Sequence, residues 1–218
     1  MPFDFLKRRK PADAADGSKA SAAAAASAAA DGFPFEGLTE DWRLVGRMTI
    51  EGRLSDVLNK RDPIPIDDVM WAPADSSDAL APAPGLRSID PYDLVIVLTG
   101  NDAQPGRSAD ESSAHRVHKI SYEVALEAPP YRVVGTVYLY PGSEPDSLLQ
   151  RSSDMFAAVV DATASIGARQ IGTGQYDTIL VNRQYLRGVE QVDLRTGERH
   201  VKLPGQRLGG TDWIDRNR

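Results

Sequence analysis

The sequence predicts a mainly β protein, β with short helices, in which one small unit occurs twice. Two observations support the β class. Apolar and polar residues alternate with period two in several stretches, and short apolar runs are separated by loops rich in Pro, Gly, Ser and Asp. A third observation, a self-similarity at an offset of about ninety positions, predicts an internal duplication. We expect two small, partly open β-barrel units, or one β-sandwich built from two similar halves.

The first copy is expected to contain strands around one short helix. Residues 42–51 alternate with period two and predict a strand with Trp42 and Leu44 on its inward face. Residues 55–61 begin with a serine suited to an N-cap and predict one or two helical turns. Two prolines then favour extended backbone as far as residue 71. Residues 92–98 predict a short buried strand.

A hairpin is expected to lead from the first copy into the second. Residues 118–128 alternate, Pro129-Pro130 predicts a turn, and residues 131–140 continue as the partner strand. Residues 145–151 predict another short helical segment. Further strands are expected at 156–162, 176–182 and 188–194, followed by a tight turn at 195–198.

The duplication is predicted from a repeated order of similar residues. The segment Trp42-Arg-Leu-Val-Gly46 is similar to Tyr131-Arg-Val-Val-Gly135, 89 positions later. The matches that follow pair Gly52 with Gly142, Asp56 with Asp146, Leu58 with Leu148, Arg61 with Arg151, Asp67 with Asp161, and Tyr92-Asp93 with Tyr176-Asp177. Carboxylates and arginines that recur in both copies favour turn or loop anchoring over acid–base catalysis.

These patterns divide the chain into four segments. We expect a tail at 1–36 that carries a short basic and apolar motif and an Ala-rich linker, a first β repeat at 37–127, a second β repeat at 128–203 and a C-terminal tail at 204–218.

Composition and charge exclude several classes of protein. The sequence has no cysteine, which removes disulfides, thiolate catalysis and cysteine-based zinc sites. The formal net charge is −6, and the first 36 residues contain five basic and five acidic side chains, so the excess negative charge lies in the remaining body. Such a body repels phosphate backbones, which makes nucleic acid an unfavourable partner. No apolar run approaches the roughly 18 residues of a membrane span, and we expect a cytoplasmic protein.

Two local resemblances accompany these patterns. Tyr176-Asp-Thr-Ile-Leu-Val-Asn-Arg183 and the following residues to 192 resemble the closing hairpin of Sm-like small barrels. That resemblance implies a ligand contact at Asn182 and Arg183. The first half departs from it, since Val97-Leu-Thr-Gly100 lacks the Asn-Arg pair. The stretches Gly52–Asn59 and Leu180–Arg183 also resemble an uncharacterised bacterial domain family with no established activity.

The sequence contains no recognisable catalytic or cofactor motif. A phosphate-cradling loop and a Gly-x-Ser-x-Gly elbow are absent, and Gly172-Thr-Gly174 precedes a strand rather than a helix. His115 and His118 lie in a loop that enters a strand, and His200 lies in a charged turn, so we expect no metal site. We therefore expect no enzyme activity, no cofactor and no catalytic residue.

The N-terminus carries a distinct motif. The apolar residues Phe3, Phe5 and Leu6 directly precede the basic run Lys7-Arg8-Arg9-Lys10. Apolar anchors beside four cations suit an acidic partner groove or reversible contact with an anionic membrane surface. We expect this motif to be a docking segment.

These expectations lead to one function hypothesis and one alternative. The leading hypothesis is a non-enzymatic accessory, adaptor or scaffold protein that uses a duplicated β module to bind a protein partner or a second copy of itself. The alternative is an RNA- or nucleotide-binding small-barrel protein that uses Asn182 and Arg183. Because paired carboxylates recur in both copies, features that do not recur are the better places to find a site.

Overall fold

The fold is seen in a computed structural model that describes residues 32–76, 79–99, 119–150, 154–172, 174–196 and 198. The N-terminal motif from Phe3 to Lys10, the three histidines and the C-terminal tail lie outside these ranges. The described helices are too short or too polar to cross a membrane.

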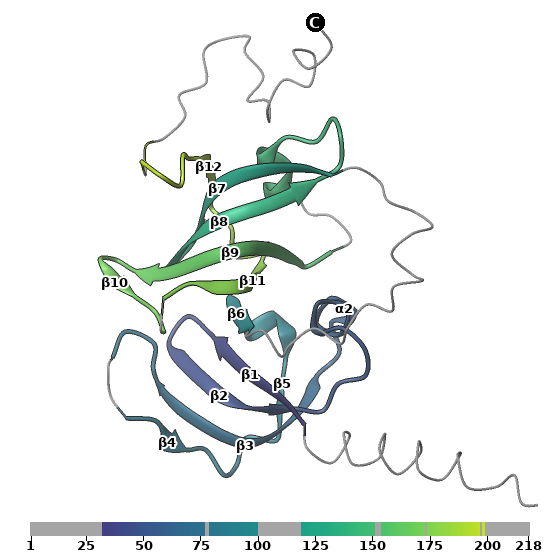
Figure 1. Ribbon diagram of the computed structural model, residues 1–218. Coiled ribbons are helices and arrows are strands. Elements are labelled where there is room, and N and C mark those ends of the chain that lie inside the picture. Colours follow the sequence, from purple (N-terminus) through teal and green to yellow (C-terminus); the bar gives the residue numbers. More distant parts are fainter. Residues whose placement is uncertain are drawn as a thin grey trace, which may run out of the picture. The chain divides into compact units, whose positions relative to one another are not determined.

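The first half contains strands that flank a short helix (Figure 1). Its elements are β1 (Phe33–Leu38), β2 (Trp42–Met48), α2 (Leu54–Lys60), β3 (Ile64–Pro73), β4 (Ala81–Pro82), β5 (Ser88–Ile89), the 3₁₀ helix η1 (Pro91–Asp93) and β6 (Ile96–Thr99). The predicted strand, helix and buried strand are confirmed. β1, however, begins at Phe33, inside the range assigned to the tail.

The second half repeats this kind of content. Its elements are β7 (Ile120–Ala128), β8 (Tyr131–Leu139), the 3₁₀ helix η3 (Pro145–Leu149), β9 (Phe156–Ile166), β10 (Arg169–Gln170), β11 (Tyr176–Asn182) and β12 (Gly188–Gln191). The predicted hairpin is confirmed, with β7 and β8 paired from Ile120 opposite Leu139 to Ala128 opposite Tyr131. β7 lies almost entirely in the range predicted for the first repeat, but it pairs with β8 and β12.

The strands of the described ranges belong to one open sheet rather than to closed barrels or to two separate sheets. The order is β12-β7-β8-β9-β11-β6-β1-β2-β3-β4, with β10 beside β9 and β5 beside β3. The mainly β class is therefore correct, whereas closure into barrels is not observed. The two halves join where β11 pairs antiparallel with β6, which Figure 1 shows side by side.

The strand order has the same form in both halves. In the first half the order is β6-β1-β2-β3-β4, and in the second half it is β12-β7-β8-β9-β11. In each half, the strand that comes last in the chain lies beside the strand that comes first. Of the five strands, the fourth in chain order lies beside the third. In this order β6 takes the place that β12 takes in the other half, so Tyr92-Asp93 and Tyr176-Asp177 do not have like places. Tyr92 lies in η1 before β6, whereas Tyr176 begins β11.

Two apolar clusters fill the halves and meet at the central strands. Ile96 and Leu98 belong to one cluster, whereas Val97, between them, belongs to the other. Because successive residues of a strand point to opposite faces, both faces of β6 are covered. β11 alternates in the same way, with Ile179 and Leu180 in different clusters. The segments Ile96-Val-Leu98 of β6 and Ile179-Leu-Val181 of β11 are accordingly continuous apolar runs, as strand segments buried on two sides are.

Each half contains one β-bulge of the same construction. The β2–β3 register shifts between Val45 and Arg47, at Gly46, and the β8–β9 register shifts between Val134 and Thr136, at Gly135. The partner strands carry aspartates with left-handed backbone, Asp68 and Asp161, at φ of 52° and 51°. The predicted match of Asp67 with Asp161 is therefore displaced by one residue.

The two halves are also joined by side-chain hydrogen bonds. The two described halves belong to one compact unit, which begins at Phe33. Among the bonds that cross between the halves are those from Asn182 to the Leu94 carbonyl (2.8 Å), from the Phe156 N–H to Asn59 (2.8 Å), from Tyr131 to the Thr39 carbonyl, from Arg169 to the Ala74 and Ser76 carbonyls (2.8 Å each), and from Tyr185 to the Tyr92 carbonyl (3.1 Å).

Candidate interaction site

The most exposed stacked aromatic side chains of the described structure are Trp42 and Trp71. Their ring centroids lie 4.7 Å apart with an interplanar angle of 21°. Each residue nevertheless remains 40% exposed. Exposed aromatic pairs are unusual on a β surface because burial of such rings is strongly favourable. Large aromatic groups left at a surface are typical of interaction sites.

Backbone pairing places these two rings side by side. Trp71 on β3 lies directly opposite Leu44 on β2, so Trp42 is its diagonal neighbour. Such diagonal positions are within reach of aromatic side chains. Trp42 follows a turn in which its N–H donates to the Thr39 Oγ1 at 2.9 Å. The sequence predicts Trp42 and Leu44 on one inward face, but only Leu44 is buried and Trp42 is exposed.

The equivalent positions of the second half are buried. Position 42 corresponds to Tyr131 and position 71 to Ala164, because Val133 lies opposite Ala164 as Leu44 lies opposite Trp71. Tyr131 and Ala164 are each 1% exposed. The turn that precedes Trp42 covers Tyr131, whose hydroxyl donates to the Thr39 carbonyl. Burial raises the pKa of Tyr131 above its usual range, and nearby Asp41 raises it further.

Three carboxylates lie next to the tryptophans along the chain. Glu40 and Asp41 precede Trp42, and Asp75 follows the strand end opposite it, where the Ala74 N–H donates to the Asp41 carbonyl at 2.8 Å. All three residues are exposed. Within the described ranges their carboxylates accept no hydrogen bond and form no ion pair. The Trp42–Trp71 surface, defined here as the two rings with these three carboxylates, therefore has an excess of negative charge.

The Asn182 side chain lies inside the fold. Asn182 is fully buried, and its amide donates to the carbonyls of Leu94 and Pro91 at 2.8 and 3.4 Å. Its Oδ1 accepts the Gln184 N–H at 3.0 Å. These bonds replace those that a buried amide would lose on leaving water. Asn182 thus links the end of β11 to the segment that precedes β6.

Arg183 closes the end of η3. Its guanidinium donates to the carbonyls of Leu148, Ser147 and Gln150 at 3.0, 2.8 and 2.8 Å. Burial lowers the pKa of this guanidinium, and Asp154 opposes that shift. Carbonyls at a helix end lack intrahelical partners, so the contacts give Arg183 a capping role.

The other polar residues singled out from the sequence do not gather into one site. Asp67 lies 3.8 Å from the exposed Arg87, and Asp68 and Asp161 belong to bulges of different strand pairs. Arg61 is the C-cap of α2, with a left-handed φ of 66°. Gly172 has a φ of 69° and lies against the Tyr176 hydroxyl. Among the described residues no group of His, Asp and Glu is arranged to hold a metal.

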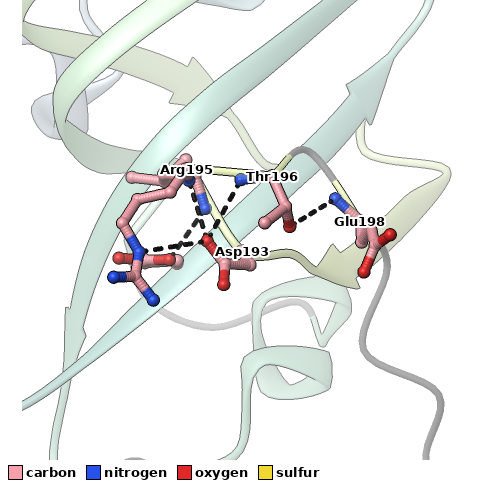
Figure 2. A network of polar contacts seen from close by, with 6 residues as sticks. Asp193, Arg195, Thr196 and Glu198 are labelled. Carbon is pink, nitrogen blue, oxygen red and sulfur yellow. Dashed lines mark hydrogen bonds and ion pairs between the residues drawn. The ribbon is translucent and has the colours of Figure 1, made fainter.

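A second polar cluster, shown in Figure 2, has a local structural explanation. The Asp193 carboxylate accepts the backbone N–H groups of Arg195 and Thr196 at 2.8 and 3.3 Å. The Thr196 hydroxyl accepts the Glu198 N–H at 3.2 Å. Such side-chain to backbone bonds stabilise turns. The tight turn predicted at 195–198 is thus present, and its charges serve the turn.

The comparisons with known proteins add no relative. No family model, no curated protein and no solved structure matches this chain.

Proposed function

We propose that this protein is a non-enzymatic adaptor or scaffold whose β body binds a protein partner through the Trp42–Trp71 surface. One observation carries the proposal. The two half-sheets have similar strand orders and carry an aromatic residue at the same place. In the second half this residue, Tyr131, is buried, whereas in the first half Trp42 is exposed and stacked on the exposed Trp71. Rigid aromatic side chains on a paired strand make contact area at low entropic cost, as interaction surfaces require.

We further propose that the two halves arose by duplication of one β unit. The identical strand order, the two glycine bulges and the buried leucines of the helical segments, Leu58 and Leu148, support this inference. On this view the shared features serve folding, and the tryptophan pair is a feature of one copy only. The adaptor is proposed to act in the cytoplasm, with the Phe3–Lys10 motif as a second docking segment for an acidic partner or a membrane surface.

The alternative of nucleic-acid binding at Asn182 and Arg183 has no supporting observation. The hydrogen bonds of both side chains described above go to backbone groups of this chain. The proposed interaction site therefore does not include this turn.

Quantitative affinity capture tests the adaptor proposal. Wild-type protein is compared with Trp42→Ala/Trp71→Ala and with a control, Tyr138→Ala/Tyr140→Ala, which removes two other exposed aromatic residues. We expect a defined set of proteins to be retained by wild type and control and lost by the tryptophan variant, with direct binding reproduced by a purified member of the set. Equal capture by all three folded proteins would refute the proposal.

A further inference from the structure

We infer that the partner segment recognised by the Trp42–Trp71 surface is a cationic peptide rich in Arg or Lys. This inference rests on the proposed interaction function and names the chemistry of its partner. It is carried by two independent features of one surface, namely an exposed aromatic stack and carboxylates that the described structure leaves without cations.

The aromatic rings favour a cation. Indole is the aromatic group that attracts cations best, and guanidinium groups stack on it readily. Stacking covers one face of each ring against the other, yet 40% of each residue remains exposed. A long basic side chain can place its apolar stem along such a ring while its charge stays close to water.

The charges around the rings are not balanced within the fold. Two arginines lie near the surface, and both already have partners, since Arg43 lies 2.7 Å from Glu36 and Arg169 donates to the Ala74 and Ser76 carbonyls. The three negative charges of Glu40, Asp41 and Asp75 outnumber the one positive charge of Arg169. The net charge of −6 adds a long-range attraction for cations.

The internal comparison supports an occupant for this position. In the second half, Tyr131 is covered by the Thr39–Trp42 turn and donates to a backbone carbonyl of that turn. Trp42, at the like position of the first half, remains 40% exposed. A bound peptide would cover the first half as the turn covers the second, and its basic side chains would meet the carboxylates.

Fluorescence titration with hexa-arginine tests the inference, with hexa-glutamate as the opposite charge. A Trp213→Phe background leaves Trp42 and Trp71 as the fluorophores. We expect a saturable change with hexa-arginine that weakens in about 0.5 M NaCl. Glu40→Gln/Asp41→Asn/Asp75→Asn should weaken it about tenfold, the equivalent of about 1.4 kcal/mol. The control Glu51→Gln/Asp56→Asn/Asp62→Asn removes the same charge beyond the other end of β2 and should change the affinity less than about twofold, because screened distant charges act weakly.

The outcomes separate the inference from the function on which it rests. No saturable binding of hexa-arginine, equal weakening by the two triple variants, or equal binding of hexa-glutamate would overturn the cationic partner. If capture in the earlier experiment still depends on the tryptophans, the interaction surface stands with a partner of another chemistry. Equal capture by wild type and the tryptophan variant, together with no saturable binding of hexa-arginine, would remove both proposals.

Discussion

Gly135 lies against Ala162 at the bulge between β8 and β9, where a Cβ on Gly135 would come within 2.9 Å of the Ala162 Cα. Asp161 has a φ of 51°, which L residues rarely adopt and which aspartate tolerates better than most. The bulge therefore depends on two special residues on neighbouring strands. Gly46 and Asp68 form the corresponding arrangement between β2 and β3.

Gly135→Ala is expected to lower the free energy of unfolding by about 1–3 kcal/mol, because the added methyl would overlap backbone and side-chain atoms of β9. Gly46→Ala should have an effect of the same sign, since its Cβ would lie 2.9 Å from the Asp67 carbonyl oxygen. Urea denaturation measures both. Gly188→Ala is the matched control, since its Cβ would make an ordinary contact at 3.6 Å with Glu127. Equal stabilities of Gly135→Ala and Gly188→Ala would contradict the bulge assignment.

Sequence patterns predict two kinds of strand well. In one kind, one face is buried and the other is exposed, and in the other kind both faces are buried. Residues 120–128 alternate because one side of β7 faces a core, and the apolar run near Val97 reflects cover on both faces. β1 lies largely within the range predicted as the tail, and it contains Pro34, a residue that is uncommon inside sheets. Pro34 is tolerated because β6 pairs with β1 only at Glu36–Leu38 and leaves its start unpaired on that side.

The Trp42–Trp71 surface could not be predicted from the sequence. The two residues belong to different strands, and their proximity depends on a register that the bulge at Gly46 shifts. Their exposure depends on which half covers the other, a tertiary property that no local pattern encodes. The repeat did contain one useful signal. The predicted match of Trp42 with Tyr131 joins residues that have like places on β2 and β8 but differ in burial.

Arg183→Ala is expected to destabilise the fold by about 1–3 kcal/mol, because three carbonyls at the end of η3 lose a charged donor. Arg183→Lys should restore only part of this, since an ammonium cannot match the planar guanidinium. Arg187→Ala, which removes the same charge from an exposed neighbour, is the control. Chemical denaturation of the three variants gives the comparison. If Arg183→Ala were as stable as Arg187→Ala, the capping role would be wrong.

Because of Tyr131, the free energy of unfolding is expected to depend on pH in the alkaline range. Its pKa is raised in the folded protein, first by burial and then by Asp41, from the usual 10.0. The folded state therefore keeps this proton at pH values where the unfolded chain releases it, so the contribution is complete below about pH 10 and is lost above it. Tyr131→Phe should cost about 1 kcal/mol at pH 8 through the lost bond to the Thr39 carbonyl. The difference between wild type and Tyr131→Phe should shrink in urea titrations as the pH rises above about 10. A difference that stays constant over this range would contradict the assignment.

The shared central strands predict that the two halves unfold together. β6 and β11 contribute alternate side chains to both clusters, so neither core can open without exposing the other. Leu126→Ala, a cavity in the second half, should destabilise the protein by about 2–5 kcal/mol. In a Trp213→Phe background, Trp42 and Trp71 report on the first half alone. Their fluorescence transition should shift to lower urea by the same amount as the circular dichroism transition. Leu58→Ala, which makes the equivalent cavity in the first half, should give coincident transitions as well. In Leu126→Ala, the fluorescence transition could instead stay at the wild-type urea concentration while circular dichroism shows a second transition. That result would mean that β6 and β11 can separate. The halves would then behave as two domains that merely share an edge.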